Sequence, residues 1–391
     1  MKHLKRIRQY ANEIFGEAVA IRRQLHEIPE LAFEEYQTAE FIKEKLDKWG
    51  IPYQDGIAGT GIVATLENGS GRCVAMRADI DALPVREEVD CAFASKIDGH
   101  MHACGHDAHM AIVLGTAYIL SQTKEDWKGT VKFLFEPGEE AEGGARPMIA
   151  EGVLKNPDVD ICLGIHVMNE VNVGTVQLTE GAAMAADDEF DLIIQGKGGH
   201  GGWPQDAIDP VTAACQVVNA LQTIVSRNVD PQDATVVSIG SIHGGTTYNV
   251  IPNSVHLQGT VRSLKEETRQ RLPLLIERVV KGVTAALGAS YELDYHWIYP
   301  PTVNAMEVNR LVEEALRSQE EIKIVWTRES SMGSDDFAFF AQEVPSAYIK
   351  LGSGTPQNRQ PLHSSKFIID EQVILNGMVT LAATTQRYLQ P

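Results

Sequence analysis

A dense cluster of metal-binding side chains occupies one short segment of the chain. Four histidines, one cysteine and one aspartate fall within ten residues, in the run His100-Met101-His102-Ala103-Cys104-Gly105-His106-Asp107-Ala108-His109. Imidazole, thiolate and carboxylate together suit zinc, with manganese, cobalt and nickel as rivals. The alternative is a histidine-rich surface loop, but this segment lies between two strongly apolar runs. We therefore expect it to bind a catalytic metal ion.

The adjacent pair Glu139-Glu140, thirty residues farther along, supplies what such a cluster lacks. A hydrolase that activates water with a metal ion also needs a base close by. One glutamate could be a ligand and the other could be the base. Without the nearby histidines, either one would read as a solvated surface charge.

Composition excludes several classes of protein. A chain of 391 residues can form two domains, and its net charge of −19 argues against nucleic-acid or anionic-membrane partners. The five cysteines are an odd number with no close pair, so we expect no disulfide framework. No signal peptide is recognisable, and no apolar run reaches the roughly 18 residues of a membrane-spanning helix. A cytoplasmic enzyme is expected.

Strands and helices alternate along the first half of the chain. Residues 4–49 predict two helices broken at Ile28-Pro29, and a buried helix is predicted at 108–120. Apolar strands are predicted at 61–66, 73–79, 131–135 and 161–165. This alternation predicts an α/β fold with a mainly parallel sheet. Polar groups follow these strands at the edge where ligand sites of open α/β sheets form, namely Asp79, Glu139, Glu140 and His166.

The pattern changes near Ala182. Strands at 190–195, 235–242, 254–262 and 291–297, with helices at 210–227 and 266–287, give the order βαββαβ of a ferredoxin-like domain. Helices near 308–319, 335–342 and 371–388 then resume the first pattern. We expect a discontinuous catalytic domain at 1–181 and 298–391, with an inserted domain at 182–297.

These segments together resemble the aminoacylase/carboxypeptidase family of two-metal hydrolases. The similarity is closest to its hippurate hydrolases, N-acyl-amino-acid amidohydrolases and plant auxin-conjugate hydrolases. It covers nearly the whole chain and rests on Arg22–Leu31, Arg77–Pro84, Met101–Asp107, Pro137–Glu140, Gly198–Gly201, Asn249–Pro252, Asp335–Ala338 and Leu362-His363. The resemblance implies that the inserted domain serves as a lid and a dimerisation domain.

The resemblance also implies two divalent ions per subunit, zinc first, with manganese, cobalt or nickel possible. The implied ligands are Cys104, His106, Glu140, His166 and His363. Cys104 and His106 are two residues apart, so in an extended loop they point to the same side. A metal ion would hold Cys104 as a thiolate. For His363 the residue chemistry alone says little, and its role rests on the family position.

Three residues are expected to take part in catalysis. By resemblance, Glu139 is the general base, and Asp79 orients a ligand histidine or tunes that base. The wider family has a histidine two residues before this aspartate, where this chain has Arg77. The branch with a cysteine ligand shows the same departure. His200 resembles the lid histidine that reaches into the partner subunit's site and stabilises the oxyanion.

Substrate binding is expected to involve the inserted domain as well. Asn249 and Arg262 resemble residues that hold the substrate carboxylate or the scissile carbonyl. For Arg262, a solvated charge at a strand end is an equal alternative. The branch often has a histidine after the proline that follows the lid loop, whereas this chain reads Trp203-Pro204-Gln205. This departure leaves the acyl pocket, and hence the substrate, open.

The sequence thus predicts a homodimeric, metal-dependent amidohydrolase that acts on N-acyl amino acids of the hippurate or N-acetyl type. One alternative is a metallo-carboxypeptidase or dipeptidase that acts on short peptides. Another is a noncatalytic metal-binding protein on the same scaffold, and the presence of Glu139 argues against it.

Overall fold

A computed structural model describes residues 2–390, and backbone contacts divide them into two compact units. The first unit holds the chain up to Gly181, Val303–Glu329 and the chain from Asp336 onward; the second holds Ala182–Thr302 and Ser330–Asp335. We had expected the inserted domain at 182–297. The later segment joins the second unit because the backbone of Ser331 is hydrogen-bonded to Ala183 and Ala185.

The first unit is built on an eight-stranded mixed sheet. In spatial order its strands are β1 (Tyr53–Ile57), β2 (Gly61–Asn68), β4 (Gly129–Glu136), β3 (Cys73–Asp79), β5 (Ile161–Asn172), β16 (Ser346–Gly354), β6 (Thr175–Thr179) and β15 (Lys323–Thr327). The central strands β4, β3, β5 and β16 run parallel, and β15 is parallel to β6. The remaining neighbours are antiparallel. The predicted mainly parallel sheet is confirmed.

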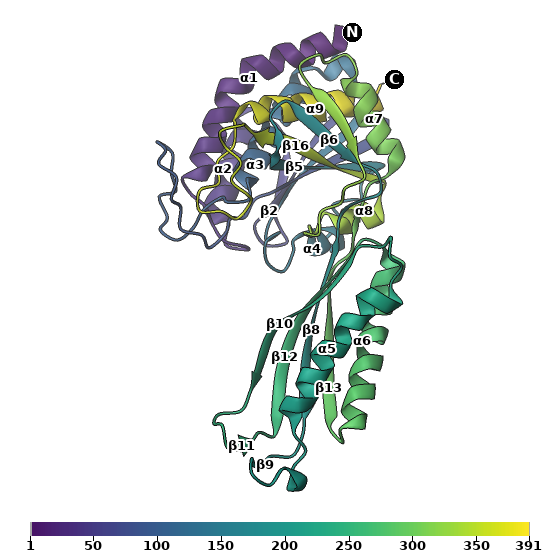
Figure 1. Cartoon of the computed structure of the whole chain (residues 1–391). Helices are drawn as coiled ribbons and strands as arrows, with labels where there is room; N and C mark the ends of the chain where they lie inside the picture. Colours follow the sequence, from purple (N-terminus) through teal and green to yellow (C-terminus); the bar gives the residue numbers. More distant parts are fainter. Residues whose placement is uncertain (1, 391) are drawn as a thin grey trace. The chain divides into compact units, whose positions relative to one another are not determined.

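Helices of the first unit enclose this sheet (Figure 1). They are α1 (Lys2–His26), α2 (Tyr36–Lys48), α3 (His106–Gln122), α4 (Ala145–Ala150), α7 (Met306–Leu316), α8 (Ala338–Glu343) and α9 (Gln372–Tyr388). Helices α1, α3 and α9 pack against one another, and α3 also contacts β3, β4 and β5. Apart from Tyr118, Ser121 and Gln122, every residue of α3 is buried. A helix buried on all sides must be enclosed by its neighbours, so packing in the core holds α3 in place.

The second unit is a four-stranded antiparallel sheet with two helices. Along the chain its elements are β8 (Ala186–Gln195), α5 (Pro210–Asn228), β10 (Thr235–Gly244), β12 (Ser254–Ser263), α6 (Glu266–Ala286) and β13 (Ser290–Tyr299). The spatial order β10-β12-β8-β13 is that of a ferredoxin-like fold, so the βαββαβ prediction is confirmed. Helices α5 and α6 cover one face (Figure 1), where Phe190, Leu192 and Ile194 are buried. This alternation is typical of an antiparallel sheet with one covered face.

Four short strands complete the fold: β7 (Ala182–Met184), β9 (Gly199–His200), β11 (Val250–Ile251) and β14 (Thr302–Val303). Strands β9 and β11 pair with each other in the second unit, where His200 lies opposite Val250. Among residues 2–390, no helix has the length and apolar character needed to cross a membrane.

Gly115 tests the packing of α3 against α9. A Cβ atom at Gly115 would overlap the side chain of Met378. Overpacking a core typically costs about 1–3 kcal/mol, so we expect Gly115→Ala to lower the free energy of unfolding by that amount. Gly16 on α1 is the control, because no atom lies within 4 Å of its added Cβ. Gly16→Ala should stabilise by up to about 1 kcal/mol. Equal stability of the two variants in urea denaturation would contradict this packing.

Candidate metal centre

The loop that carries Cys104 and His106 is pressed against strand β5. Gly105 lies between these two residues with φ of 90°, in the left-handed region. A Cβ atom at this position would also collide with Cγ2 of Val167. Glycine alone satisfies both constraints. As a result Cys104 Sγ lies 3.4 Å from Nε2 of His166, the residue before Val167.

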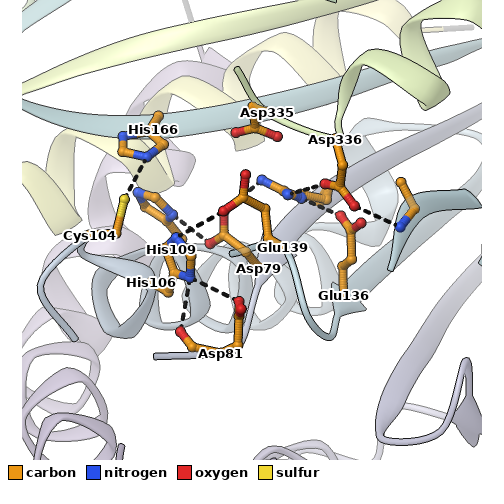
Figure 2. Close-up of polar contacts among 12 residues, drawn as sticks. Asp79, Asp81, Cys104, His106, His109, Glu136, Glu139, His166, Asp335 and Asp336 are labelled. Atoms are coloured by element: carbon orange, nitrogen blue, oxygen red, sulfur yellow. Dashed lines mark hydrogen bonds and ion pairs between the residues drawn. The ribbon is translucent and has the colours of Figure 1, made fainter. Parts of the chain in front are cut away.

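The five ligands expected from the sequence form overlapping groups of donor atoms in the first unit. Cys104, His106 and His166 make one group (Figure 2), and Cys104, Glu140 and His363 make another. Within each group the donor atoms all lie within 4.8 Å of one another. Cys104 is common to both groups. One sulfur shared by two sets of donors is an arrangement that can hold a pair of metal ions.

Hydrogen bonds fix the tautomers of the two buried ligand histidines. Nδ1 of His106 lies 2.9 Å from the carbonyl oxygen of Asp81, and Nδ1 of His166 lies 2.8 Å from the carbonyl oxygen of Val167. A carbonyl oxygen can only accept, so both Nδ1 atoms donate. In each ring Nε2 is therefore the nitrogen that can bind a metal ion, with Nδ1 held from behind.

Buried atoms without partners also point to a cation. Nε2 of His106 is buried and makes no hydrogen bond within residues 2–390, and the same holds for both ring nitrogens of the nearby His102. Burial and the carboxylates of Glu140 and Glu139 hold the pKa of the Cys104 thiol well above its ordinary value. For His106, burial opposes protonation, but nearby carboxylates led by Asp79 raise its pKa to about 10. A bound metal ion would supply the positive charge that these groups require.

His363 reaches the same place from a strained backbone. Its φ is 65°, which is uncommon for a residue with a side chain. The strain is held by its backbone N–H, which donates to the carbonyl oxygen of Ala103 at 2.9 Å. Its Nε2 lies 3.1 Å from Oε1 of Glu140. Strain of this kind is concentrated at functional sites, where the surrounding structure holds it.

Asp79 touches a histidine that has no free ring nitrogen. Its Oδ1 lies 2.7 Å from Nδ1 of His109, and Nε2 of His109 accepts from the backbone N–H of Val167 at 2.9 Å. His109 therefore donates to Asp79 through Nδ1. Both its nitrogens are engaged, so it supports the middle of β5 beside His166 and does not bind metal in this arrangement.

Asp81 is a supporting residue to which sequence reasoning gave no role. Its side chain lies 3.2 Å from Nδ1 of His106 through Oδ1, and through Oδ2 it accepts from the backbone N–H of Glu140 at 2.9 Å. It thus braces two expected ligands at once. The sequence feature that could have indicated this role is its position, two residues after Asp79 in the segment that carries the family resemblance.

Glu139 lies beside the donor groups and is mostly buried. Its Oε2 is 3.9 Å from Nε2 of His106, and its relative exposure is 8%. The loop before it is anchored by Glu35, whose Oε1 accepts from the backbone N–H of Gly138 at 2.9 Å. Its carboxylate also forms a group of possible metal donors with His106 and Glu140. A carboxylate held this close to the expected ligands can transfer protons.

The other expected site residues lie in the second unit. His200 is exposed, and its Nδ1 accepts from the backbone N–H of Gly202 at 3.0 Å, so the ring proton is on Nε2. The backbone carbonyl of Asn249 accepts from Gly201 at 2.8 Å, which brings Asn249 next to this loop. Arg262 forms an ion pair with Asp187 in its own unit.

Comparisons with known proteins agree with this geometry. The model of the peptidase family M20/M25/M40 matches residues 75–387. The thermostable carboxypeptidase 1 of Saccharolobus solfataricus is 38% identical over 99% of each chain. The N-acetylcysteine deacetylase of Bacillus subtilis is 39% identical over 91% of this chain and 92% of that one. The solved YXEP protein of Bacillus subtilis, described as a dinuclear metal-binding M20 peptidase, is 34% identical with a TM-score of 0.86, over 97% and 99% of the two chains.

Cobalt substitution tests whether the thiol of Cys104 binds metal. We expect the cobalt-loaded protein to show a sulfur-to-metal charge-transfer band, because thiolate is the form of cysteine that coordinates. Cys104→Ser should abolish the band. Cys215→Ser is the matched control, since Cys215 is exposed on α5 in the second unit. A fully loaded wild-type protein without the band would remove Cys104 from the ligand set.

Proposed function

Because the chain belongs to the peptidase family M20/M25/M40 and is a metal-dependent amidohydrolase, we propose that it hydrolyses the amide bond of N-acyl amino acids. The products are a carboxylic acid and a free amino acid. The observation that carries this proposal is the buried carboxylate of Glu139 beside two donor groups that share Cys104. Similarity to an N-acetylcysteine deacetylase supports the substrate class. The noncatalytic alternative is set aside.

The residues divide the chemistry between metal binding and proton transfer. We assign the ions to Cys104, His106, Glu140, His166 and His363. When bound, divalent ions would lower the pKa of water and polarise the amide carbonyl. Glu139 takes a proton from the attacking water and delivers it to the leaving amine. Asp79 keeps the segment of β5 that follows His166 in place through His109.

His200 is assigned to the oxyanion. Its Nδ1 already accepts from Gly202, so Nε2–H is the group that can donate to a developing negative charge. We propose that it completes the site of a second subunit in a homodimer, since an isologous dimer is the simplest closed exchange. Asn249 and Arg262 would hold the substrate carboxylate or the scissile carbonyl, with Asp187 fixing the Arg262 guanidinium.

A carboxypeptidase or dipeptidase is the second candidate, and similarity to the thermostable carboxypeptidase 1 favours it. The bond broken would be of the same kind. The two candidates differ in whether the group on nitrogen is a simple acyl chain or an amino acid. Trp203 bears on this choice, because its ring lies 4.6 Å from the ring of His200 and places a bulky aromatic beside the expected oxyanion donor.

A substrate panel with two isosteric variants tests the proposed function. Metal-loaded protein is incubated with N-acetyl and N-benzoyl amino acids and with dipeptides, and the freed amine is measured. Glu139→Gln should keep its metal but lose roughly 10²–10⁴-fold in kcat, as expected when a general base is removed. Glu140→Gln should instead lose metal. Release of amine only from dipeptides would favour the second candidate, and full activity in both variants would exclude this carboxylate pair from the site.

Subunit complementation tests the role of His200. Loss of an oxyanion donor typically costs a factor of about 10²–10³, so His200→Ala should be nearly inactive while still binding metal. Mixing it with inactive Glu139→Gln subunits should restore part of the activity, because hybrid dimers contain one site with both residues intact. If subunits exchange and no activity returns, His200 acts within its own chain or has no catalytic role.

A further inference from the structure

Arg77 lies at the centre of a buried cluster of carboxylates beside the metal-binding groups. Its guanidinium donates to Asp79 Oδ2 at 2.6 Å and to Asp336 Oδ1 at 2.8 Å, and its Nε donates to Glu136. All four side chains have a relative exposure of 0%. A guanidinium is always charged and offers donors in a rigid planar fork. One fixed cation therefore faces three acidic groups.

The geometry shows which acidic group is neutral. Oε1 of Glu136 is buried and has no hydrogen-bond donor among the described residues, whereas Asp336 Oδ2 accepts from the backbone N–H of Ala145 and Asp79 Oδ1 accepts from Nδ1 of His109. Where three buried carboxyl groups surround one guanidinium, the group with the fewest donors is the one that needs a proton. Burial raises the pKa of Glu136 well above its ordinary value. Burial would also raise the pKa of Asp79, but nearby positive groups, Arg77 foremost, have the larger effect and lower it. Glu136 therefore carries the proton.

The same cluster holds both ends of the loop that bears Glu139 and Glu140. Glu136 is the last residue of β4, immediately before the loop. Ala145 begins α4 immediately after it, and its backbone N–H donates to Asp336 Oδ2 at 2.9 Å. The two ends also touch each other, because a Cβ atom at Gly144 would collide with the carbonyl oxygen of Pro137.

We propose that Arg77, Asp336 and a protonated Glu136 form a clamp that closes the loop at 137–144 and so positions Glu139 and Glu140. The roles of those two glutamates rest on the proposed function. Arg77 is a positioning residue that does not touch the substrate. It also engages Oδ2 of Asp79, while Oδ1 faces His109, so Asp79 is retained as a support and not as a ligand.

A matched pair of isosteric changes tests the clamp. A protonated carboxyl and an amide both offer one acceptor and one donor, so Glu136→Gln should keep kcat within about twofold and leave metal content unchanged. Asp336→Asn turns an acceptor toward Arg77 or Ala145 into a donor. Misplacement of catalytic groups by about 1 Å can cost 10²-fold, so kcat should fall by roughly that factor, with KM little changed. Equal effects of the two changes would overturn the proposal.

Folding outcomes are informative as well. An insoluble Asp336→Asn protein beside a soluble, active Glu136→Gln protein supports the clamp, because only the ionised position then requires its charge. Failure of Glu136→Gln to fold or to bind metal overturns it. A fully active Asp336→Asn protein overturns it too.

The pH dependence of stability tests the proton on Glu136 without any substrate. The pKa of Glu136 is about 4.5 in the unfolded chain and higher in the folded protein. Its contribution to the free energy of unfolding is therefore complete below pH 4.5 and is lost as the pH rises toward the folded pKa. Glu136→Gln lacks this loss. The difference in Tm between the variant and the wild type should therefore increase as the pH rises above 4.5.

The groups facing Glu136 allow the pH-dependent change in Tm to be assigned to it. They are Arg77, which stays charged, Asp336, whose negative charge raises the pKa of Glu136, and the thiol of Cys162, whose pKa burial raises. A constant Tm difference would show that Glu136 is ionised in the fold and would overturn the proposal. If no substrate of the panel is cleaved but the Tm difference increases, the clamp stands and only the proposed function fails.

Discussion

Negative charge buried at one edge of the eight-stranded sheet is the constraint on which the rest of the site depends. An unpaired buried carboxylate costs several kcal/mol, so every acidic group there needs a donor, a proton or a cation. The structure meets this need in two ways. On one side the fixed guanidinium of Arg77 offsets part of the charge, and the proton proposed for Glu136 removes more of it. On the other side, Cys104 lies against Nε2 of His166 and Glu140 against Nε2 of His363, and divalent ions would supply the positive charge there.

The residues assigned to catalysis and those assigned to substrate recognition lie in different units. The groups assigned to metal binding and proton transfer all belong to the first unit, where a close-packed helix and parallel strands hold them. The groups assigned to the substrate and the oxyanion lie on exposed loops and strands of the second unit. Under the proposed function, substrate preference can therefore change through Trp203 and its neighbours while the buried charge balance stays as it is.

Much of this fold could be predicted from local pattern. The long apolar runs and the βαββαβ order gave β2, β3, β4, the main strands of the second unit and most helices within a few residues. Strands β1, β6 and β15 were not predicted, and β5 extends seven residues beyond the predicted 161–165. Strand β16 was missed, although it lies in the middle of the sheet, because Lys350 and two glycines interrupt its apolar pattern. Lys350 is nevertheless 5% exposed. Its burial depends on tertiary neighbours that no local window contains.

For the site, residue type and spacing brought out the ligands but not their supports. The clustered histidines and the adjacent glutamates are visible in a short stretch of sequence. The supporting contacts of Arg77 join β3 to the end of β4 and to Asp336, which is separated from it by 259 positions. Nothing in the sequence near Arg77 distinguishes a buried hub from a surface charge. Only the folded chain shows that its three partners converge.

The place of β16 in the sheet has a consequence for how the protein is made. Strand β5 is buried along most of its length, and one of its two edges is completed by β16. A ribosome makes β16 only after the whole of the second unit between Ala182 and Thr302. Until then the nascent chain carries an apolar strand with an open edge, which is prone to pair with other chains. The C-terminal segment that contains β16 must therefore emerge before this edge of β5 can be covered.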